Sequence, residues 1–473
     1  MKAEIKERWK WILDGEVPQG YKKTKVGIIP REWEVKEIRD VATIKTGSTP
    51  PTKDLDNYGK EYLFVSPLDL GYKKYITYTE KKLSKKGFNA SRTIPQNSVL
   101  FTCIGSTIGK MGIASCILTT NQQINSICPN SSFDFEYLYY ILYQKRNKIK
   151  RLAGEQAVPQ INKTHFGQTK IPLPPLPEQN NIATILSTWD KAIDLKEELI
   201  EQKKLQKKWL MQNLLTGKVR LPEFDTSPVD KAERIRMIND GRVPEGYKKT
   251  KVGIIPEKWE IKKLNEIGFF SKGKNITLKE TVSKGLPTVL YGDLYTKYDS
   301  YFTKTYHYIS EDKSKKSTRV KTGDLLFTTS GETAEEIGKC SCYLGKEPIY
   351  IGGDIIKLTP YSYNSLFLGY QQNSYVLITK KAQLGQGYSV VHIYQSHLED
   401  LEIPLPPIPE QQAIANILST ADKEIGLLEK EVNTLKKQKK GLMQLLLTGI
   451  VRTTGMKLSS DEKTEEGVAY AEE

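Results

Sequence analysis

Residues 171–194 read IPLPPLPEQNNIATILSTWDKAID, and residues 403–426 read IPLPPIPEQQAIANILSTADKEIG. This repetition at an offset of 232 residues indicates a duplicated chain. An earlier pair supports the duplication, because VPQGYKKTKVGIIPREWEVK at residues 17–36 returns at residues 243–262 with 16 of 20 residues unchanged. A period of about 230 residues far exceeds the roughly 20 to 50 residues of a solenoid repeat, so the chain contains two domain-sized halves.

Each Pro-rich turn leads into a long amphipathic segment. Pro177 and Pro409 suit the first turn of a helix, where the missing amide hydrogen is not needed, and the glutamate after each favours the positive end of the helix dipole. Gly217 and Gly449 suit positions just beyond a helix, because glycine readily adopts the left-handed conformation. The sequence therefore predicts two helices of about 40 residues, each roughly 60 Å long at about 1.5 Å per residue.

Apolar residues repeat with 3-4 spacing from Leu418 to Leu446, which is the pattern of a coiled-coil seam. The first helix has a less regular seam, because Lys196, Lys203 and Lys207 stand at matching positions. Isolated amphipathic helices of this length need a partner, and a pseudo-twofold axis between the halves would make the two helices pair antiparallel. The alternative is that each helix packs on its own domain.

Between the matched blocks the two halves share little except a skeleton, in which VLFT at residues 99–102 parallels LLFT at residues 325–328. Short apolar runs broken by Gly, Pro, Asn and Thr predict mainly β structure here, with helices over residues 135–151 and 365–381. We therefore expect an α+β fold, in which two mixed α/β domains are joined by two long helices that pair as an antiparallel coiled coil. The repeated blocks, which we call the frames, indicate one task performed twice. The divergent segments between them, which we call the inserts, indicate two different tasks.

These patterns divide the chain into five segments. Trp33 and Trp259 close the repeated GIIPxxW blocks and are expected to anchor the two cores. The expected segments are residues 1–175 for the first domain, 176–220 for the first helix region, 221–407 for the second domain with a linker at 221–242, 408–452 for the second helix region, and 453–473 for an acidic, disordered tail.

The charge of the chain is unevenly distributed. Its 473 residues carry a net charge of +15, but residues 459–473 carry −5, which leaves +20 on the rest. Such a basic body predicts a polyanionic partner, with nucleic acid as the first candidate. No window approaches the roughly 18 apolar residues of a membrane span, and the first residues lack the apolar run of a signal peptide. Five cysteines are few for this length and odd in number, which favours free thiols and a cytoplasmic location.

No motif provides a convincing catalytic or cofactor site. GSTIGK at residues 105–110 has three residues between its glycines, where a phosphate-binding loop has four. Cys340 and Cys342 have no second pair at the spacing of a zinc site. His165 and His397 match at the 232-residue offset, but no nucleophile or carboxylate recurs beside both, so we interpret them as structural residues near a helix start. Motifs of methyltransferases, helicases and nucleases are missing.

Two sets of polar residues are candidates for contacting nucleic acid. Lysines cluster upstream of the VLFT and LLFT runs in both inserts, and this recurrence favours phosphate contacts over a merely solvated surface. Amide side chains can pair bidentately with adenine, and lysine can contact guanine or phosphate. The basic candidates are Lys74, Lys81, Lys82, Lys85, Lys313, Lys315 and Lys316. The loop candidates are Ser106, Thr107, Lys110, Asn121, Gln122, Gln123 and Gln160 in the first insert, with Thr333, Lys339, Asp354, Tyr388 and His392 in the second.

The order of parts, in which a variable domain and a PLPPxPEQ helix each occur twice, resembles the DNA-specificity subunit (S subunit) of type I restriction-modification systems. Further marks are GIIP at residues 27–30 and 253–256, the tryptophan that follows each, and the LLTG that ends each helix. The resemblance covers nearly all of the chain up to about residue 452. It implies a non-catalytic subunit, in which two target-recognition domains each read one half of an asymmetric bipartite DNA site and the paired helices set the spacer.

The resemblance also implies partners and cofactors. Two methyltransferase subunits would dock on the repeated frame and use S-adenosylmethionine to methylate adenine. Two motor-nuclease subunits would then use ATP and Mg²⁺ to translocate and cut unmodified double-stranded DNA. No cofactor, metal or membrane is expected to bind this chain itself.

Two other classes of function stay open from the residues alone. A duplicated scaffold would assemble protein partners through its helices without reading bases. A stand-alone enzyme would cleave or modify DNA when supplied with ATP, Mg²⁺ and S-adenosylmethionine. Salt-dependent binding that distinguishes one sequence from scrambled duplex separates a DNA reader from a scaffold.

Overall fold

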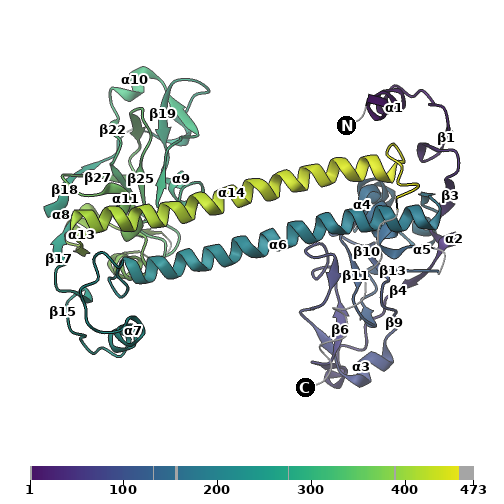
Figure 1. Cartoon of the computed structure of the whole chain (residues 1–473), viewed down its shortest axis with the longest axis horizontal. Coiled ribbons are helices and arrows are strands. Elements are labelled where there is room, and N and C mark those ends of the chain that lie inside the picture. Colours follow the sequence, from purple (N-terminus) through teal and green to yellow (C-terminus); the bar gives the residue numbers. More distant parts are fainter. Residues whose placement is uncertain (1–2, 131–132, 155–157, 275, 388–389, 457–473) are drawn as a thin grey trace. The chain divides into compact units, whose positions relative to one another are not determined.

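The computed structural model describes residues 3–130, 133–154, 158–274, 276–387 and 390–456. The chain forms two compact units, whose elements are labelled in Figure 1. The first unit comprises Met1–Lys196 and Glu431–Glu473, and the second comprises Glu197–Lys430. Each unit therefore contains the frame and insert of one repeat, together with parts of both long helices.

A five-stranded sheet forms the centre of the first insert. It is mainly antiparallel, with β10 paired to β13 on one side and to β11 on the other, and only the edge strand β7 runs parallel to its neighbour. In order across the sheet, the strands are β4 (Ala42–Thr46), β13 (Ile124–Pro129), β10 (Val99–Thr102), β11 (Met111–Ala114) and β7 (Tyr75–Ile76). The helix α4 (Phe135–Lys150) buries Tyr137, Leu138 and Ile141 in the same core.

A smaller sheet with its own core completes the first insert. Val65, Leu100 and Leu118 are buried in that core. In order, its strands are β5 (Tyr58–Gly59), β8 (Lys82–Leu83), β6 (Tyr62–Val65), β12 (Leu118–Thr120) and β9 (Thr93–Ile94), with the short helix α3 (Lys85–Ala90) after β8.

The second insert repeats this plan, which confirms two mixed α/β domains. Its larger sheet contains, in order, β18 (Gly268–Lys272), β27 (Ile355–Pro360), β23 (Leu325–Thr328), β25 (Cys340–Tyr343) and β20 (Tyr301–Phe302). Its smaller sheet contains β21 (His307–Ile309), β19 (Leu286–Val289), β26 (Ile349–Ile351) and β22 (Thr318–Val320), and short helices α9 (Tyr291–Thr296) and α10 (Glu311–Ser314) flank these strands in sequence.

Residues 365–381, expected as one helix, form two helices, α11 (Ser365–Gln372) and α12 (Tyr375–Leu384). The break falls at Asn373, whose side chain exchanges hydrogen bonds with the backbone of Cys340 and also donates to the Gly369 carbonyl. Asparagine side chains compete in this way for backbone partners and so end helices. The counterpart α4 in the first unit is continuous, as expected.

Each repeated frame begins with a helix and a two-stranded hairpin, and the two hairpins have the same register. In the second frame, Arg234 of α7 makes a bidentate pair with Asp225, so the segment expected as a linker at 221–242 contains an anchored helix. These elements are α1 (Ala3–Leu13), β1 (Tyr21–Thr24) and β2 (Gly27–Pro30) in the first unit, and α7 (Lys231–Asn239), β15 (Tyr247–Thr250) and β16 (Gly253–Pro256) in the second.

A strand that follows each hairpin pairs with the strand before each Pro-rich turn. The pairs are β3 (Glu34–Glu37) with β14 (Lys170–Leu173), and β17 (Glu260–Lys263) with β29 (Glu402–Leu405). The matched histidines lie just upstream, in the short helices α5 (Lys163–Gly167) and α13 (Gln395–Glu399), and α2 (Ile38–Val41) and α8 (Leu264–Ile267) follow β3 and β17.

The two predicted long helices are α6 (Leu176–Leu214) and α14 (Ile408–Leu447). In the first unit, Asp190 and Lys196 of α6 pair with Lys439 and Glu431 of α14, so residue numbers fall along one helix as they rise along the other. The second unit shows the same direction of pairing, because Lys203 and Lys207 of α6 pair with Glu424 and Asp422 of α14. The helices are antiparallel partners, and the alternative in which each packs only on its own domain is wrong.

The lysines that interrupt the predicted seam are neutralised by carboxylates of the facing helix. Lys196 lies 2.9 Å from Glu431, and Lys203 lies 2.8 Å from Glu424. Apolar seam residues such as Ile193, Ile200 and Val432 are buried. Charged residues beside an apolar seam fix register and orientation, because a shifted alignment would bring them against the wrong partners.

Each long helix ends at a glycine beyond its last turn, as predicted. Gly449 has φ +71° and Gly217 has φ +70°, a conformation that favours glycine. A Cβ at either position would lie 2.5 Å from the ring of Pro30 or Pro256, respectively. The end of α14 therefore docks on the first frame, and the end of α6 docks on the second.

A glutamate in the first turn of each long helix also contacts a frame, Glu178 in the first unit and Glu410 in the second. Trp33 Nε1 donates to Glu178 at 2.8 Å, and Arg452 contacts the same carboxylate. In the second unit, Trp259 donates to Glu410, which also forms a bidentate pair with Arg220. Both tryptophans are fully buried, which confirms them as core anchors.

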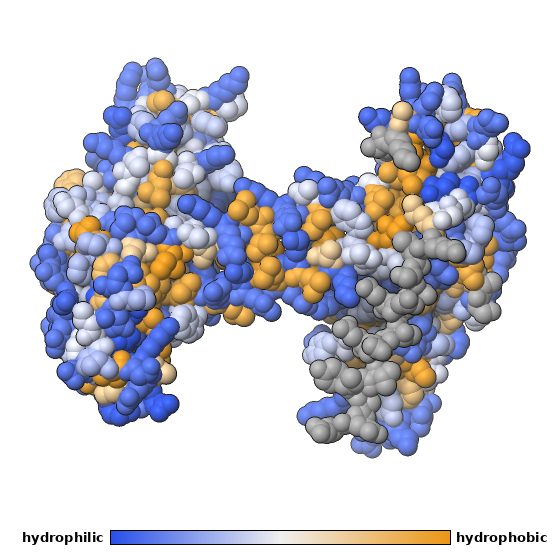
Figure 2. All heavy atoms as spheres, viewed as in Figure 1, coloured by the Kyte–Doolittle hydropathy of each residue, from blue (hydrophilic) through white to orange (hydrophobic). Residues whose placement is uncertain are grey.

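Apolar residues interrupt the largely hydrophilic surface of the helices (Figure 2). In the second unit, the exposed apolar side chains on α6 and α14 include Leu199, Leu205, Trp209 and Leu427. Among the described residues, no helix is both long enough and apolar enough to cross a lipid bilayer.

Candidate nucleic-acid interface

Four loops meet at one end of the larger sheet in the first unit. Because β10 is antiparallel to both β11 and β13, and β13 to β4, the connections at 47–53, 103–110 and 121–123 emerge at the same edge. Residues 158–161 join them, since Gly105 N donates to the Pro159 carbonyl at 2.9 Å. We call these four loops the first loop end. All seven loop candidates of the first insert lie in it: Ser106, Thr107, Lys110, Asn121, Gln122, Gln123 and Gln160.

Hydrogen bonds organise the amide side chains of the first loop end. Asn121 Nδ2 donates to Gln123 Oε1 at 2.9 Å, and the Asn121 oxygen accepts from the Gln123 backbone. Thr49 donates to the side-chain oxygen of the exposed Gln122 at 2.6 Å. Among the described residues, nothing occupies the amide nitrogen of Gln122, so this group can donate to a base edge.

Aromatic contacts hold the lysine of this end in place. The Lys110 ammonium lies 4.9 Å from the ring centre of Tyr72, a strongly exposed side chain. A cation over an aromatic ring keeps its charge and its remaining hydrogens, so Lys110 can still reach a phosphate or a guanine.

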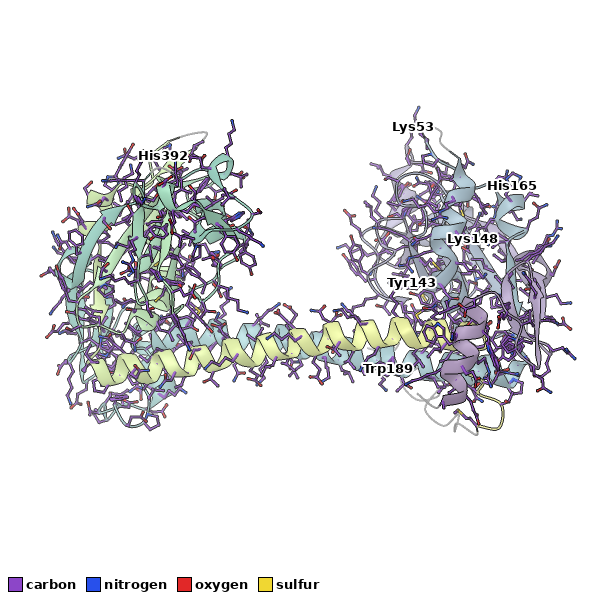
Figure 3. The ribbon with its side chains drawn as sticks, turned by 90° about the horizontal axis from the view of Figure 1, so that it is seen from above. Lys53, Tyr143, Lys148, His165, Trp189 and His392 are labelled. Carbon is purple, nitrogen blue, oxygen red and sulfur yellow. The ribbon has the colours of Figure 1, made fainter. Side chains whose placement is uncertain are left out.

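Loops also meet at the equivalent edge of the larger sheet in the second unit. Thr329 N donates to the Asp354 carbonyl, and Ile393 N donates to the Thr329 carbonyl, which joins the segments 329–339, 352–354 and 386–393. The short strands β24 (Ser330–Gly331) and β28 (Val391–His392) pair antiparallel within this second loop end. Thr333, Asp354 and His392 are exposed there, and Figure 3 labels His392. Tyr388 lies outside the described residues.

His392 and Lys339 have defined partners in the second loop end. His392 Nδ1 lies 3.0 Å from Ser330 Oγ, which orients the imidazole ring. Lys339 is half-buried, and its ammonium donates to the Tyr295 carbonyl at 3.1 Å. Burial lowers the pKa of Lys339, and this contact ties the loop to α9. Lys339 therefore holds the loop at 329–339 against α9.

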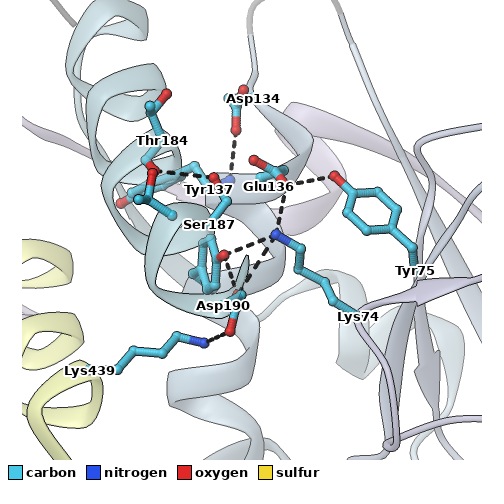
Figure 4. A network of polar contacts seen from close by, with 11 residues as sticks. Lys74, Tyr75, Asp134, Glu136, Tyr137, Thr184, Ser187, Asp190 and Lys439 are labelled. Atoms are coloured by element: carbon cyan, nitrogen blue, oxygen red, sulfur yellow. Dashed lines mark hydrogen bonds and ion pairs between the residues drawn. The ribbon is translucent and has the colours of Figure 1, made fainter. Parts of the chain in front are cut away.

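Lys74, predicted to contact DNA, instead lies in a half-buried network between the insert and α6 (Figure 4). Its side chain is only 12% exposed, and its ammonium lies 2.8 Å from Glu136 and 3.7 Å from Asp190. Tyr75 donates to the same Glu136 carboxylate. Burial and Glu136 raise the pKa of Tyr75, so its hydroxyl stays protonated as a donor. The sequence could not reveal this, because both carboxylates come from distant helices.

The other basic candidates lie in or near the smaller sheets, with Lys82 in β8, Lys85 in α3 and Lys313 in α10. Lys81 and Lys85 are exposed, and the Lys82 ammonium lies 5.8 Å from the ring centre of Tyr78. In the second unit, Lys313 pairs with Glu280, and Lys315 lies 3.2 Å from Asp312. Lys316 is exposed. Surface ion pairs of this kind contribute about 0 to 1 kcal/mol, so phosphate could displace the carboxylates.

Sequence reasoning missed three side chains beside the first loop end. Thr49 positions Gln122, Lys53 lies in the same loop, and Arg146 of α4 lies against Gly109. Figure 3 labels Lys53. A signal was available for Arg146, because residues 145–151 read KRNKIKR. Thr49 carried no signal, since its role depends on the pairing of β4 with β13.

The part of the chain that the structure describes contains no cluster of metal ligands, and several of its thiols are buried. Among the described residues, no group of three or more His, Cys, Asp or Glu side chains could hold a metal ion. All five cysteines are free thiols, as predicted. Burial raises the pKa of Cys103 and Cys340 to about 12, which keeps these thiols protonated and unreactive near neutral pH.

Comparison with known proteins gives one consistent result. Residues 30–204 and 256–437 match the family described as "Type I restriction modification DNA specificity domain". The chain is 28% identical to the type I restriction enzyme MjaVIII specificity subunit of Methanocaldococcus jannaschii, over 90% of this chain and 95% of that protein. It is 29% identical to the putative type I restriction enzyme MjaX specificity subunit of the same organism, over 92% and 97%, respectively. Its fold resembles the S subunit of a type I restriction-modification system from M. genitalium, with a TM-score of 0.53 and 16% identity over 88% of this chain and 96% of that one.

Proposed function

The chain belongs to the type I restriction-modification DNA specificity family, and on that premise we propose that it is the DNA-recognition subunit of such a complex. The observation that carries the proposal is the pair of loop ends. Both lie at the same edge of sheets with the same strand order, yet their exposed residues differ. One framework that presents two different sets of polar side chains suits the reading of two different DNA sequences.

Each loop end would read one half of a bipartite, asymmetric target. Gln122 in the first loop end presents an amide that can pair with adenine, while Thr333 and His392 provide hydroxyl and imidazole groups in the second. The flanking lysines would contact phosphates and position each domain without specifying sequence.

The antiparallel helices would set the length of the unspecific spacer between the half-sites. α6 has 39 residues and α14 has 40, so each is roughly 60 Å long. Ion pairs such as Lys203–Glu424 oppose sliding of one helix along the other. A helix pair of fixed register suits a ruler better than a flexible linker does.

The repeated frame would dock two copies of a methyltransferase subunit, and two motor-nuclease subunits would then complete the complex. The exposed apolar side chains on the helices suit such a contact. We assign S-adenosylmethionine, ATP and Mg²⁺ to those partner subunits and no chemical step to this chain. The complex would act on DNA in the cytoplasm.

Methylome sequencing of cells with and without the gene tests this function directly. We expect loss of methylated adenines from one bipartite motif when the gene is deleted, and their return on complementation. The scaffold alternative predicts that swapping residues 31–170 for the matching insert of a relative leaves the methylated motif unchanged. We expect the swap to change one half of the motif only, and an unchanged motif would refute base reading.

A further inference from the structure

The C-terminal part of α4 carries a cluster of basic side chains that none of the assignments above uses. The cluster consists of Lys145, Arg146, Lys148, Lys150 and Arg151, and we call it the α4 basic cluster. Lys148, Lys150 and Arg151 are exposed, because Ile149 and the apolar side of the helix face the core. Figure 3 labels Lys148 and Tyr143 on this helix.

No carboxylate among the described residues pairs with the α4 basic cluster. The one acidic residue of α4, Glu136, lies at the other end of the helix and pairs with Lys74. A helix C-terminus favours positive charge, but its dipole is equivalent to only about −0.5 of an elementary charge. Five cations exceed what that dipole can balance. Burial and the charge of Lys148 lower the pKa of Lys145, as expected for cations crowded together.

The fold does not require all of these charges, because the second unit is built without three of them. Asp134 caps α4 by accepting from Tyr137 N at 2.7 Å, and Asn364 caps α11 by accepting from Phe367 N at 2.8 Å, so the two helix starts correspond. Counting from these caps, the positions of Lys145, Arg146 and Lys148 are taken by uncharged residues in the second unit. These are Tyr375, Val376 and Ile378. Lysines stand at the positions of Lys150 and Arg151, but Lys380 is half-buried and Lys381 is fully buried, so neither presents a fully exposed charge.

The α4 basic cluster adjoins the first loop end. A Cβ at Gly109 would lie 3.8 Å from the Cβ of Arg146. The Arg146 guanidinium stacks 3.7 Å from the ring centre of Tyr143 and donates to the Tyr143 carbonyl at 2.7 Å. An arginine held in this way loses little freedom when it contacts an anion, and it keeps further N–H groups that can donate.

We propose that the α4 basic cluster binds the DNA phosphate backbone next to the first half-site and gives the first unit a sequence-independent grip on DNA. The inference rests on the proposed function, since it places DNA at the first loop end. Each phosphate that such a cluster neutralises releases counterions and adds about 0.9 to the slope of log affinity against log salt.

The test compares two triple variants of the full chain, alone and assembled with its methyltransferase partner. One variant carries Lys148→Gln, Lys150→Gln and Arg151→Gln. The matched control carries Lys10→Gln, Lys23→Gln and Lys25→Gln, which removes the same charge from exposed positions on α1, in β1 and in the β1–β2 turn. Fluorescence anisotropy would measure binding to the target duplex and to a scrambled duplex between 50 and 200 mM salt.

We expect the α4 variant to lower the salt slope by about 2 to 3 on both duplexes, while the ratio of their affinities stays unchanged. The control should change the slope by less than about 1. If the α4 variant and the wild type have equal slopes of log affinity against log salt and the sequence preference is intact, this inference is overturned and the proposed function stands. A wild type that binds both duplexes equally would overturn the proposed function. Failure of the α4 variant to assemble with the partner, with its DNA slope unchanged, would identify a protein interface and would also overturn the inference.

Discussion

Asp190 of α6 accepts a hydrogen bond from Tyr140 of α4 at 2.5 Å. The second unit repeats the contact, because Asp422 of α14 accepts from Tyr370 of α11, also at 2.5 Å. Each aspartate in addition pairs with a lysine of the facing long helix, Lys439 for Asp190 and Lys207 for Asp422. One carboxylate in each unit therefore joins three helices and holds an insert against the helix pair.

Replacing Asp190 should destabilise the first unit. Asp190→Asn removes the charge that Lys439 and Lys74 share in a half-buried site, and an unpaired cation there should cost about 2 to 3 kcal/mol of unfolding free energy. Urea unfolding measures the effect. Glu34→Gln is the control, because the pair Glu34–Lys36 is exposed and its loss should cost less than about 0.5 kcal/mol. Equal effects of the two variants would contradict a special role for Asp190.

The glycines beyond the long helices should tolerate no side chain. Gly449→Ala and Gly217→Ala place a Cβ 2.5 Å from a proline ring at a φ near +70°, and we expect each to cost at least about 2 kcal/mol. Gly426→Ala provides the control within α14, where a Cβ meets nothing within 4 Å. That variant should gain about 0.5 to 1 kcal/mol from helix propensity. Thermal unfolding distinguishes the opposite signs.

Lys381 should make stability depend on alkaline pH. Its ammonium is fully buried, where it donates to the Gly338 and Gln372 carbonyls, and burial lowers its pKa to about 8. Between about pH 8 and its ordinary value of 10.5, the unfolded chain binds the proton and the folded chain does not, so stability rises with pH.

The comparison for this prediction is Lys381→Met, which lacks the titrating group. The stability of the wild type relative to that variant should increase by about 3 kcal/mol across the window, as urea titrations at several pH values would show. Other groups titrate alike in both proteins, so their contributions cancel in the difference between the two unfolding free energies. A constant difference between pH 8 and 10.5 would rule out the lowered pKa.

Single changes in the loop ends should alter one half-site each. Gln122→Ala should relax base preference by about tenfold at one position of the first half-site, and His392→Ala should do so in the second. Methylome sequencing of complemented cells detects both changes. Gln202→Ala, an exposed amide on α6, is the matched control and should leave the motif unaltered. Relaxation of both halves by one variant would contradict independent reading.

Much of the frame could be predicted from the sequence, because the duplication gave its local patterns a second copy. The two helices, their glycine ends and the tryptophan anchors all followed from repeated motifs. Features that depend on residues distant in the sequence could not be predicted. The break at Asn373 depends on the Cys340 backbone, and the half-buried setting of Lys74 depends on Glu136 and Asp190.

The candidate nucleic-acid interface could likewise be predicted only in part. The loop residues from Ser106 to Gln160 could be named as candidates from their residue types alone, and the structure brings them together at one edge of the larger sheet. Their mutual arrangement could not be predicted, since the contact of Thr49 with Gln122 depends on which strands pair. The charge run at residues 145–151 was visible in the sequence, but a charge run does not show which loop it adjoins.

The docking of α14 on the first frame has a consequence for synthesis on the ribosome. The second unit is contiguous and is complete once Lys430 has been made. The first unit must wait for Glu431 onward, because Arg452 pairs with Glu178 and Gly449 packs on Pro30 and Trp33. The first unit therefore closes after the second, and its frame stays open to chaperones until residues 431–452 have been made.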